Sequence, residues 1–170
     1  GLPLADNLDR LALAPLLFAP GTAWRYSLGI DVIGAVLEAA AGKTLPEIVR
    51  DEISSPLGLA DTGFAVLDPA RLAAPYAAGW EEPVRMTDTT TVPMDGAAVR
   101  FSPDRIFDAA SYPSGGAGMA GTADDLLIFL EAIRGGGAPI LEPRTVARMR
   151  RDQAGCQAQT RGAGWGFSYG

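Results

Sequence analysis

Histidine is absent from the 170-residue sequence, cysteine occurs once, as Cys156, and Lys43 is the one lysine among 14 basic residues. Without histidine, the chain cannot supply a histidine general base or a Cys–His pair, and a single cysteine cannot form the usual kind of zinc site. A single cysteine also excludes a disulfide within the chain, and we interpret Cys156 as a loop thiol. We predict neither a metal site nor a cofactor.

Long apolar runs and an excess of positive charge are missing as well. No run reaches the roughly 20 residues of a membrane span, and no segment resembles a signal peptide. The net charge of −6 argues against nucleic acid as a partner. We interpret one local group of arginines as solvent-facing residues at a helix end, where the helix dipole favours positive charge: Arg144, Arg148, Arg150 and Arg151. We expect neither a membrane nor a nucleic-acid partner, and the sequence leaves open a cytoplasmic or a periplasmic location.

The residues that are present are typical of one globular domain, with 48% hydrophobic and 20% charged side chains. Apolar periodicity predicts a mainly helical chain. The helix over residues 29–41 is apolar almost all round, so we expect it to be central and buried. The predicted helices cover residues 6–13, 29–41, 44–53, 122–134 and 143–150.

Two of these helices carry a recognisable start signal. Thr44 with Glu47 has the spacing of a capping box, and Thr122 with Asp125 suggests a second capped start. The helix that begins at Thr44 is expected to end before Pro56, because proline cannot continue a regular helix.

The segment from residue 57 to 114 has little periodicity and is predicted to be a long excursion, with short strands over Val84–Met86 and Ala97–Phe101. Residues Trp165–Tyr169 alternate large aromatic and small side chains, and form the one good strand pattern. A single strand needs partners, so we expect its partners outside the chain. The predicted organisation is a helical domain over 1–160 and, over 161–170, a strand that returns to a sheet.

Three short motifs match catalytic signatures without the context that those signatures need. Residues 116–121 read G-x-G-x-x-G without a preceding buried strand, so we interpret these glycines as space for a close backbone approach. Residues 166–170 read G-x-S-x-G without any histidine, so Ser168 is predicted to be a strand residue. Asp61-Thr62-Gly63 matches half of an aspartic-protease site, and we interpret it as a turn closed by the Asp61 side chain.

Tyr26 directly precedes the helix that we expect to be buried, and two interpretations of it are open. It is a hydrogen-bonded core phenol, or it is a general base if a neighbouring cation favours its phenolate. Lys43 lies beyond the far end of that helix, and no residue of the chain is spaced to supply the cation.

Ordered blocks along nearly the whole chain resemble one family. Each block is weak alone, but together they are similar to serine β-lactamase-like hydrolases, which include class C β-lactamases, DD-peptidases and family VIII carboxylesterases, with the esterase branch closest. The blocks cover residues 18–28, 31–34, 42–44, 56–64, 114–119, 122–125 and 162–166.

The resemblance implies roles for particular residues. In that family the serine of S-x-x-K is the nucleophile, and its lysine shares general-base work with the tyrosine of Y-x-N. Tyr26 matches this tyrosine, with Trp24 packed beneath it. Leu28 replaces the asparagine, which argues against efficient β-lactam turnover and suits an ester substrate. The substrate-binding residues implied are Ser27, Leu28, Gly116, Ala117 and Gly118.

Neither S-x-x-K nor the family's third motif occurs in the 170 residues. Because the chain also begins at Gly1, without methionine, we expect an internal fragment whose partner is the remainder of the same protein. The S-x-x-K would then precede Gly1 and the third motif would follow Gly170. The implied fold is the helical domain of the β-lactamase/transpeptidase-like α/β fold plus one returning sheet strand.

The expected function is part of a serine hydrolase that cleaves carboxylic esters through an acyl-enzyme, with a small-molecule ester or amide as substrate. The chain alone is expected to be inactive, and the excursion over 57–114 to determine substrate choice. Two alternatives are a β-lactamase or D-amino-acid peptidase on the same fold, and a non-catalytic binding module, which the missing nucleophile would suit.

Overall fold

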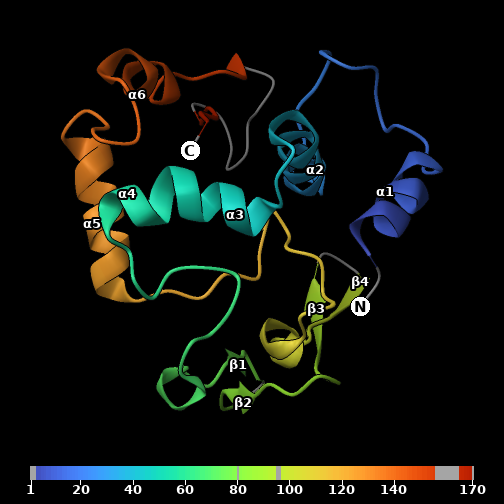
Figure 1. Ribbon diagram of the computed structural model, residues 1–170. Helices are drawn as coiled ribbons and strands as arrows, with labels where there is room; N and C mark the ends of the chain where they lie inside the picture. Colours follow the sequence, from blue (N-terminus) through green and yellow to red (C-terminus); the bar gives the residue numbers. More distant parts are fainter. Residues whose placement is uncertain (1–2, 80, 95–96, 156–164, 170) are drawn as a thin grey trace.

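The computed structural model describes residues 3–79, 81–94, 97–155 and 165–169, and it is mainly helical with a little β-structure, as predicted (Figure 1). The helices are α1 Leu4–Ala12, α2 Gly29–Ala41, α3 Leu45–Val49, α4 Ser55–Leu57, α5 Ala123–Arg134 and α6 Pro143–Met149. The strands are β1 Tyr76–Ala77, β2 Val84–Arg85, β3 Thr91–Met94 and β4 Ala97–Arg100.

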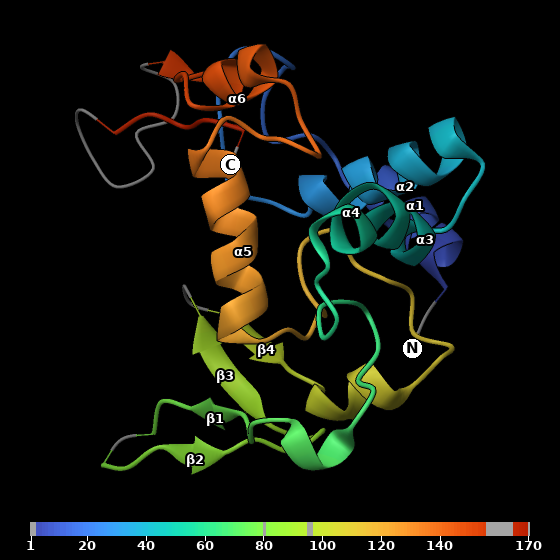
Figure 2. The same cartoon turned by 60° about the vertical axis from the view of Figure 1, so that its left-hand side comes forward.

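Helices α3 and α4 form one continuous rod that connects the other parts of the molecule. One end of the rod contacts α2 and the other contacts α5. In two views, α6 lies on one side of the rod and the hairpins of the 57–114 excursion lie on the other (Figures 1 and 2). The buried apolar side chains among the described residues lie on or beside these helices: Leu45, Leu59 and Val146.

Both predicted helix starts are confirmed. The backbone N–H of Thr44 donates to the Glu47 carboxylate over 2.8 Å, and the Thr122 hydroxyl accepts from the N–H of Asp125 over 3.2 Å. The Glu47 and Thr122 side chains thus accept hydrogen bonds from backbone N–H groups at the helix start. These N–H groups have no acceptor within the helix itself. Helix α2 has the predicted bounds, and Gly42 ends it in the left-handed conformation with a φ of 64°.

The prediction that the helix after Thr44 ends before Pro56 is wrong. The chain passes from α3 through a π-helical turn over Arg50–Ser54 into α4, which contains Pro56. In the wider π turn, the N–H of Ser55 donates to the carbonyl of Arg50, five residues back. Because the register widens just before Pro56, the helix tolerates a residue that has no N–H to donate.

The prediction that α2 is buried is also wrong for the described residues. Its buried residues are Asp31 and Gly34, whereas Ile33 and Val36 are 56% and 60% exposed. A helix that is apolar all round needs cover on every side, and the described chain covers α2 on one side only, through α3 and the loop over 114–118. Within the described ranges, no helix combines the length and apolar character that a bilayer crossing requires.

The strands predicted near Val84 and Ala97 are confirmed as β2 and β4, and each pairs in an antiparallel hairpin, with β1 and β3 respectively. The expectation that Trp165–Tyr169 is the one good strand is therefore wrong. These five residues pair with no strand of the described chain, and their backbone instead bonds near the end of α6, where the Tyr169 N–H donates to the Met149 carbonyl over 3.3 Å. Their return to a sheet outside the chain stays a prediction.

Candidate active site

The loop over residues 114–118 is seated directly on the beginning of α2. A Cβ added to Gly115 would lie 2.4 Å from the carbonyl oxygen of Ile30, and one added to Gly34 would lie 3.6 Å from the N of Gly115. No side chain fits at 2.4 Å from a backbone atom, so Gly115 allows this contact. The close backbone approach predicted for this glycine-rich segment is therefore present, and it joins the loop to α2.

The same loop is held in shape by Ser114, a residue that is only 8% exposed. Its hydroxyl accepts from the N–H groups of Gly116 and Ala117, each over 3.1 Å. Gly118 then adopts a φ of 94°, a conformation that favours glycine. Two backbone donors of the loop are thus directed at Ser114 rather than into the space beside it.

The Tyr26–Leu28 segment leads into α2 on the same side. The Ser27 hydroxyl accepts from the N–H of Gly29 over 3.2 Å, in a local turn just before the helix. Leu28 is 54% exposed, and the Tyr26 side chain is 82% exposed. Tyr26 is therefore not a buried core phenol within the described chain, and its role as a base stays a prediction.

All six predicted site residues line one broad, open cavity of about 2610 Å³. Tyr26, Ser27 and Leu28 approach it from the start of α2, and Gly116, Ala117 and Gly118 from the loop. The structure thus brings together two segments that lie far apart in the sequence. The roles of these residues in catalysis and substrate binding stay predictions.

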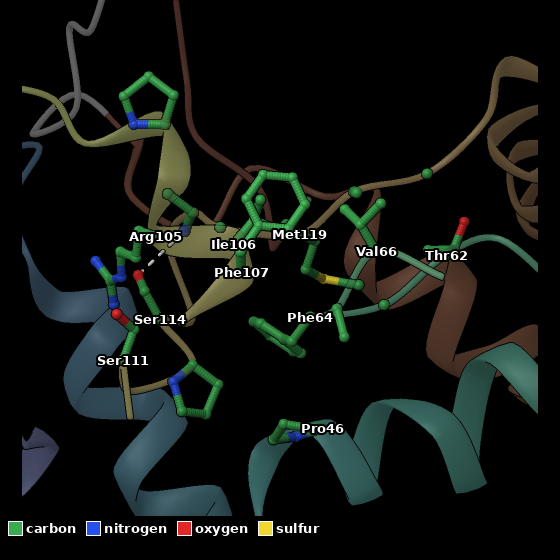
Figure 3. Close-up of a pocket in the computed structure, with 18 of the residues that line it drawn as sticks. Pro46, Thr62, Phe64, Val66, Arg105, Ile106, Phe107, Ser111, Ser114 and Met119 are labelled. Atoms are coloured by element: carbon green, nitrogen blue, oxygen red, sulfur yellow. Dashed lines mark hydrogen bonds between the residues drawn. The ribbon is translucent and has the colours of Figure 1, made fainter. Parts of the chain in front are cut away.

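The excursion and the loop that follows it supply an apolar wall to this cavity, whose residues the sequence did not identify one by one. Figure 3 shows Phe64, Val66 and Met119 across from Arg105 and Ser114, with Ile106 and Phe107 beside Arg105. The members of the wall are Phe64, Val66, Ile106, Phe107 and Met119. Such a wall can bind the hydrocarbon part of a small molecule.

Arg105 is held at the cavity by Tyr112. Its guanidinium lies 4.5 Å from the centre of the Tyr112 ring, and it donates to the Tyr112 carbonyl. The Tyr112 hydroxyl in turn accepts from the amide of Asn7 in α1 over 3.0 Å. These contacts fix the end of the excursion against the first helix.

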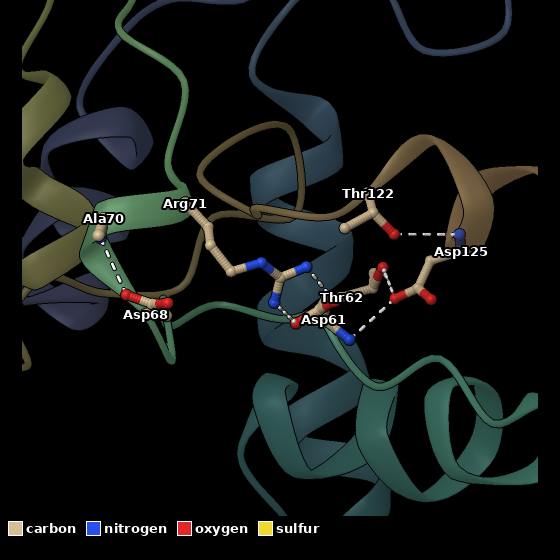
Figure 4. Close-up of polar contacts among 7 residues, drawn as sticks. All are labelled: Asp61, Thr62, Asp68, Ala70, Arg71, Thr122 and Asp125. Atoms are coloured by element: carbon tan, nitrogen blue, oxygen red, sulfur yellow. Dashed lines mark hydrogen bonds and ion pairs between the residues drawn. The ribbon is translucent and has the colours of Figure 1, made fainter.

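Asp61-Thr62-Gly63 does not form the turn that we predicted. Figure 4 shows the Asp61 carboxylate paired with both terminal nitrogens of Arg71, at 2.7 Å each. The buried carboxylate of Asp125 instead accepts from the Asp61 N–H over 2.9 Å and from the Thr62 hydroxyl over 2.8 Å. The predicted turn does not form because Arg71 binds the Asp61 carboxylate that would close it. The Asp125 carboxylate of α5 accepts from the backbone N–H of Asp61.

Opposite charges shift the pKa of the acids and bases in two ion pairs. The hydrogen bonds from the Arg71 guanidinium lower the pKa of Asp61. The hydrogen bond to Asp51, over 3.0 Å, raises the pKa of Lys43 and keeps it an ammonium group. Lys43 is therefore paired with Asp51 on the surface. Among the described residues, no group of three or more metal-binding side chains is placed to hold a metal ion.

Trp24 contacts a different ring from the one expected. Its ring centre lies 4.6 Å from that of Phe167, with the planes tilted by 41°. This contact ties the segment before Tyr26 to the described C-terminal residues. Ser168 lies beside Phe167 in this non-strand segment, so its prediction as a strand residue is not met within the described chain.

The described residues form a mainly helical unit with an open cavity beside α2, and the comparisons with known proteins place this unit in a family. The family model described as Beta-lactamase matches residues 2–170, so the chain belongs to the β-lactamase family. The resemblance drawn from the sequence blocks is thereby confirmed.

Three similar proteins define the relationship further. Esterase EstB of Burkholderia gladioli is 55% identical over 170 residues, which cover 98% of this chain and 43% of that esterase. The solved structure of EstCE1, a hydrolase with promiscuous acyltransferase activity, is 45% identical with a TM-score of 0.92, covering 99% of this chain and 45% of that one. A penicillin-binding protein from Bacillus halodurans is 20% identical with a TM-score of 0.67, covers 98% of this chain and 45% of that one, and shows the fold alone. The chain spans less than half the length of each of these proteins.

Proposed function

We propose that the protein that contains this chain is a serine hydrolase that cleaves small carboxylic esters through an acyl-enzyme. The single observation that carries the proposal is the position of Tyr26, whose exposed phenol lines the same cavity as the Gly116–Gly118 loop. The 55% identity to an esterase supports the reaction class. The nucleophilic serine and its lysine, in an S-x-x-K motif, would come from outside residues 1–170.

In this reaction the Tyr26 phenolate accepts the proton of the serine hydroxyl as the serine oxygen attacks the ester carbonyl. The proton then passes to the departing alcohol, which leaves the acyl group on the serine. Water attacks the acyl-enzyme, gives up a proton to the same base, and releases the acid. Tyr26 thus acts as a base in the attack steps and as an acid when each leaving group departs.

The walls of the cavity suit an ester with a hydrocarbon part. Leu28 and the apolar wall defined above offer no hydrogen bonds and exclude water from the acyl or alcohol group. The N–H groups of Gly116 and Ala117 bond to Ser114, so in this arrangement the loop contributes shape rather than donors for an oxyanion. Substrate choice would then depend on the size of the apolar group.

The test uses the intact protein with a short p-nitrophenyl ester. We expect Tyr26→Phe to lower kcat by on the order of a hundredfold or more, because the base is lost. Tyr76→Phe is the matched control, since Tyr76 is also exposed but is not among the cavity-lining residues, and it should leave kcat unchanged.

Four results would contradict the proposal. Intact protein that hydrolyses no ester excludes the activity, and near-normal turnover in Tyr26→Phe excludes the base. Hydrolysis of a chromogenic cephalosporin at a rate that rivals the ester would favour a β-lactamase. Failure of a fluorophosphonate probe to label the intact protein would favour a binding module without a nucleophile.

A further inference from the structure

Asp31 is the one side chain of the described residues with a buried polar atom that has no hydrogen-bond partner. It is the third residue of α2, its exposure is 5%, and its Oδ1 receives no hydrogen bond. A buried carboxylate that has lost its water needs donors in exchange. The positive end of the α2 dipole favours a negative charge here, but it does not replace a hydrogen bond.

The surroundings of Asp31 belong to the candidate active site. Its N–H donates to the carbonyl of Leu28 over 3.0 Å, so it lies one helical turn after the Tyr26–Leu28 segment. A Cβ added to Gly116 would lie 3.5 Å from its Oδ2, so the glycine-rich loop covers it. Asp31 also lines the cavity that Tyr26 lines.

Among the described residues no lysine or arginine forms an ion pair with Asp31, and this includes Arg25, the exposed arginine beside Tyr26. Lys43 and Arg50 pair with Asp51, and Arg71 pairs with Asp61. The loop over 114–118 carries no titratable side chain. A basic partner for Asp31 would therefore come from beyond residues 1–170, and the relatives that this chain matches are more than twice as long as the matched region.

We infer that Asp31 is a positioning residue whose carboxylate receives an ammonium or guanidinium group from the rest of the protein and holds that cation beside Tyr26. The inference rests on the proposed function, because a tyrosine base requires a nearby positive charge to form its phenolate. The cation favours the phenolate, and Asp31 keeps the cation in place. Asp31 itself touches neither substrate nor the reacting atoms.

The experiment compares Asp31→Asn with Asp124→Asn in the intact protein. Asp124 is an exposed aspartate in the first turn of α5, so the control removes the same charge near a helix start. Two quantities are measured: the midpoint of thermal unfolding, and the pH at which kcat/KM for the ester rises. Wild-type turnover and the loss in Tyr26→Phe are measured first, so failure of the proposed function is recognised separately.

If Asp31 holds a cation, Asp31→Asn breaks a buried ion pair and the unfolding midpoint falls, whereas Asp124→Asn changes it little. The released cation no longer favours the phenolate, so the rise in kcat/KM moves to higher pH by about one unit. The other charged groups near this position, Arg25 beside Tyr26 and Glu38 bonded to the Leu45 N–H, are the same in both proteins. Asp31→Ser, which also removes the charge, gives a second measurement should Asp31→Asn fold poorly.

The opposite direction overturns the inference. If Asp31 were a bare carboxylate, its removal would take a negative charge away from Tyr26 and move the rise in kcat/KM to lower pH. A raised unfolding midpoint would likewise show that the carboxylate had been unpaired. A pH profile that does not move shows that Asp31 holds no cation at the base.

Discussion

Asp125 and Asp31 are two buried aspartates at the same position of two helices, but their surroundings differ. Each is the third residue of its helix, α5 or α2, and the two are 7% and 5% exposed. The Asp125 carboxylate accepts two hydrogen bonds, from Asp61 and Thr62, whereas Oδ1 of Asp31 accepts none. The position in the helix and the degree of burial therefore do not decide whether a carboxylate receives hydrogen bonds. The segment that packs over the carboxylate decides this, because it supplies the donors.

The two helices therefore differ in how well the described chain satisfies their buried carboxylates. Asp125 of α5 has its donors within the chain, whereas Oδ1 of Asp31 in α2 has none there. At α5, the segment over residues 61–62 supplies every donor that Asp125 uses. At α2, a glycine-rich loop covers Asp31 without supplying a donor, and several apolar side chains of the same helix stay exposed. The start of α2 therefore carries both the carboxylate oxygen without a donor and the tyrosine that we propose as the base.

The largest effect is expected at the satisfied member of the pair. Asp125→Ala in the intact protein leaves the Asp61 N–H and the Thr62 hydroxyl without their acceptor, which should cost about 3 kcal/mol of the free energy of unfolding. Denaturant unfolding measures this loss. Asp124→Ala, one residue away and exposed, should change it by less than about 0.5 kcal/mol. Equal changes in the two variants would mean that water replaces the Asp125 carboxylate at little cost.

A second, smaller effect is expected where the loop covers Asp31. Gly115→Ala places a Cβ 2.4 Å from the Ile30 carbonyl oxygen, so the loop must move off α2, at a cost of about 2 kcal/mol. Ester turnover should fall as well, because the loop is one wall of the cavity. Gly63→Ala is the control, since an added Cβ there meets nothing within 4 Å. If the two variants lose the same amount of stability and turnover, the loop can move off α2 at little cost. The contact at Gly115 would then not be what keeps Asp31 buried.

Much of the helical framework could be predicted from the sequence because its signals are local. The bounds of α2, the capping pairs at Thr44 and Thr122, and the glycine at 42 act within one or two turns. The strands β1 and β2 have two residues each, too short for an alternating pattern, so the first hairpin was recognised only in part. The π turn that carries the chain past Pro56 has no pattern of its own in the sequence.

The candidate site was predictable in its members but not in its contacts. The family blocks indicated Tyr26 and the Gly116–Gly118 loop, and the structure brings both to one cavity. Asp31 is one of two charged residues in an otherwise apolar helix, and its lack of a partner depends on a loop that is distant in the sequence. The partner of Asp61 was missed for a related reason, since Arg71 follows ten residues later in an irregular segment.

The smallest effect is expected at the pair of Asp61 and Arg71, which lies beside Asp125 but is partly exposed. Hydrogen bonds from Arg71 lower the pKa of Asp61 in the folded protein below its ordinary value of 3.8. The folded state therefore favours the ionised carboxylate more than the unfolded state does. The pair therefore stabilises the protein above that value, and the contribution is lost as the pH falls through the lowered pKa. Asp61→Asn should be less stable than wild type at neutral pH, and the difference should close in acid.

Unfolding by denaturant across a pH series measures that difference, with Asp9→Asn as the control because Asp9 is an exposed aspartate of α1 with no ion pair among those described. Added salt should reduce the effect of Asp61→Asn, since the pair is reached by solvent and its charges are screened. A difference that persists in acid would contradict the prediction, because it would show that Asp61→Asn acts through something other than the charge of the pair; the backbone N–H that donates to Asp125 is present in both proteins.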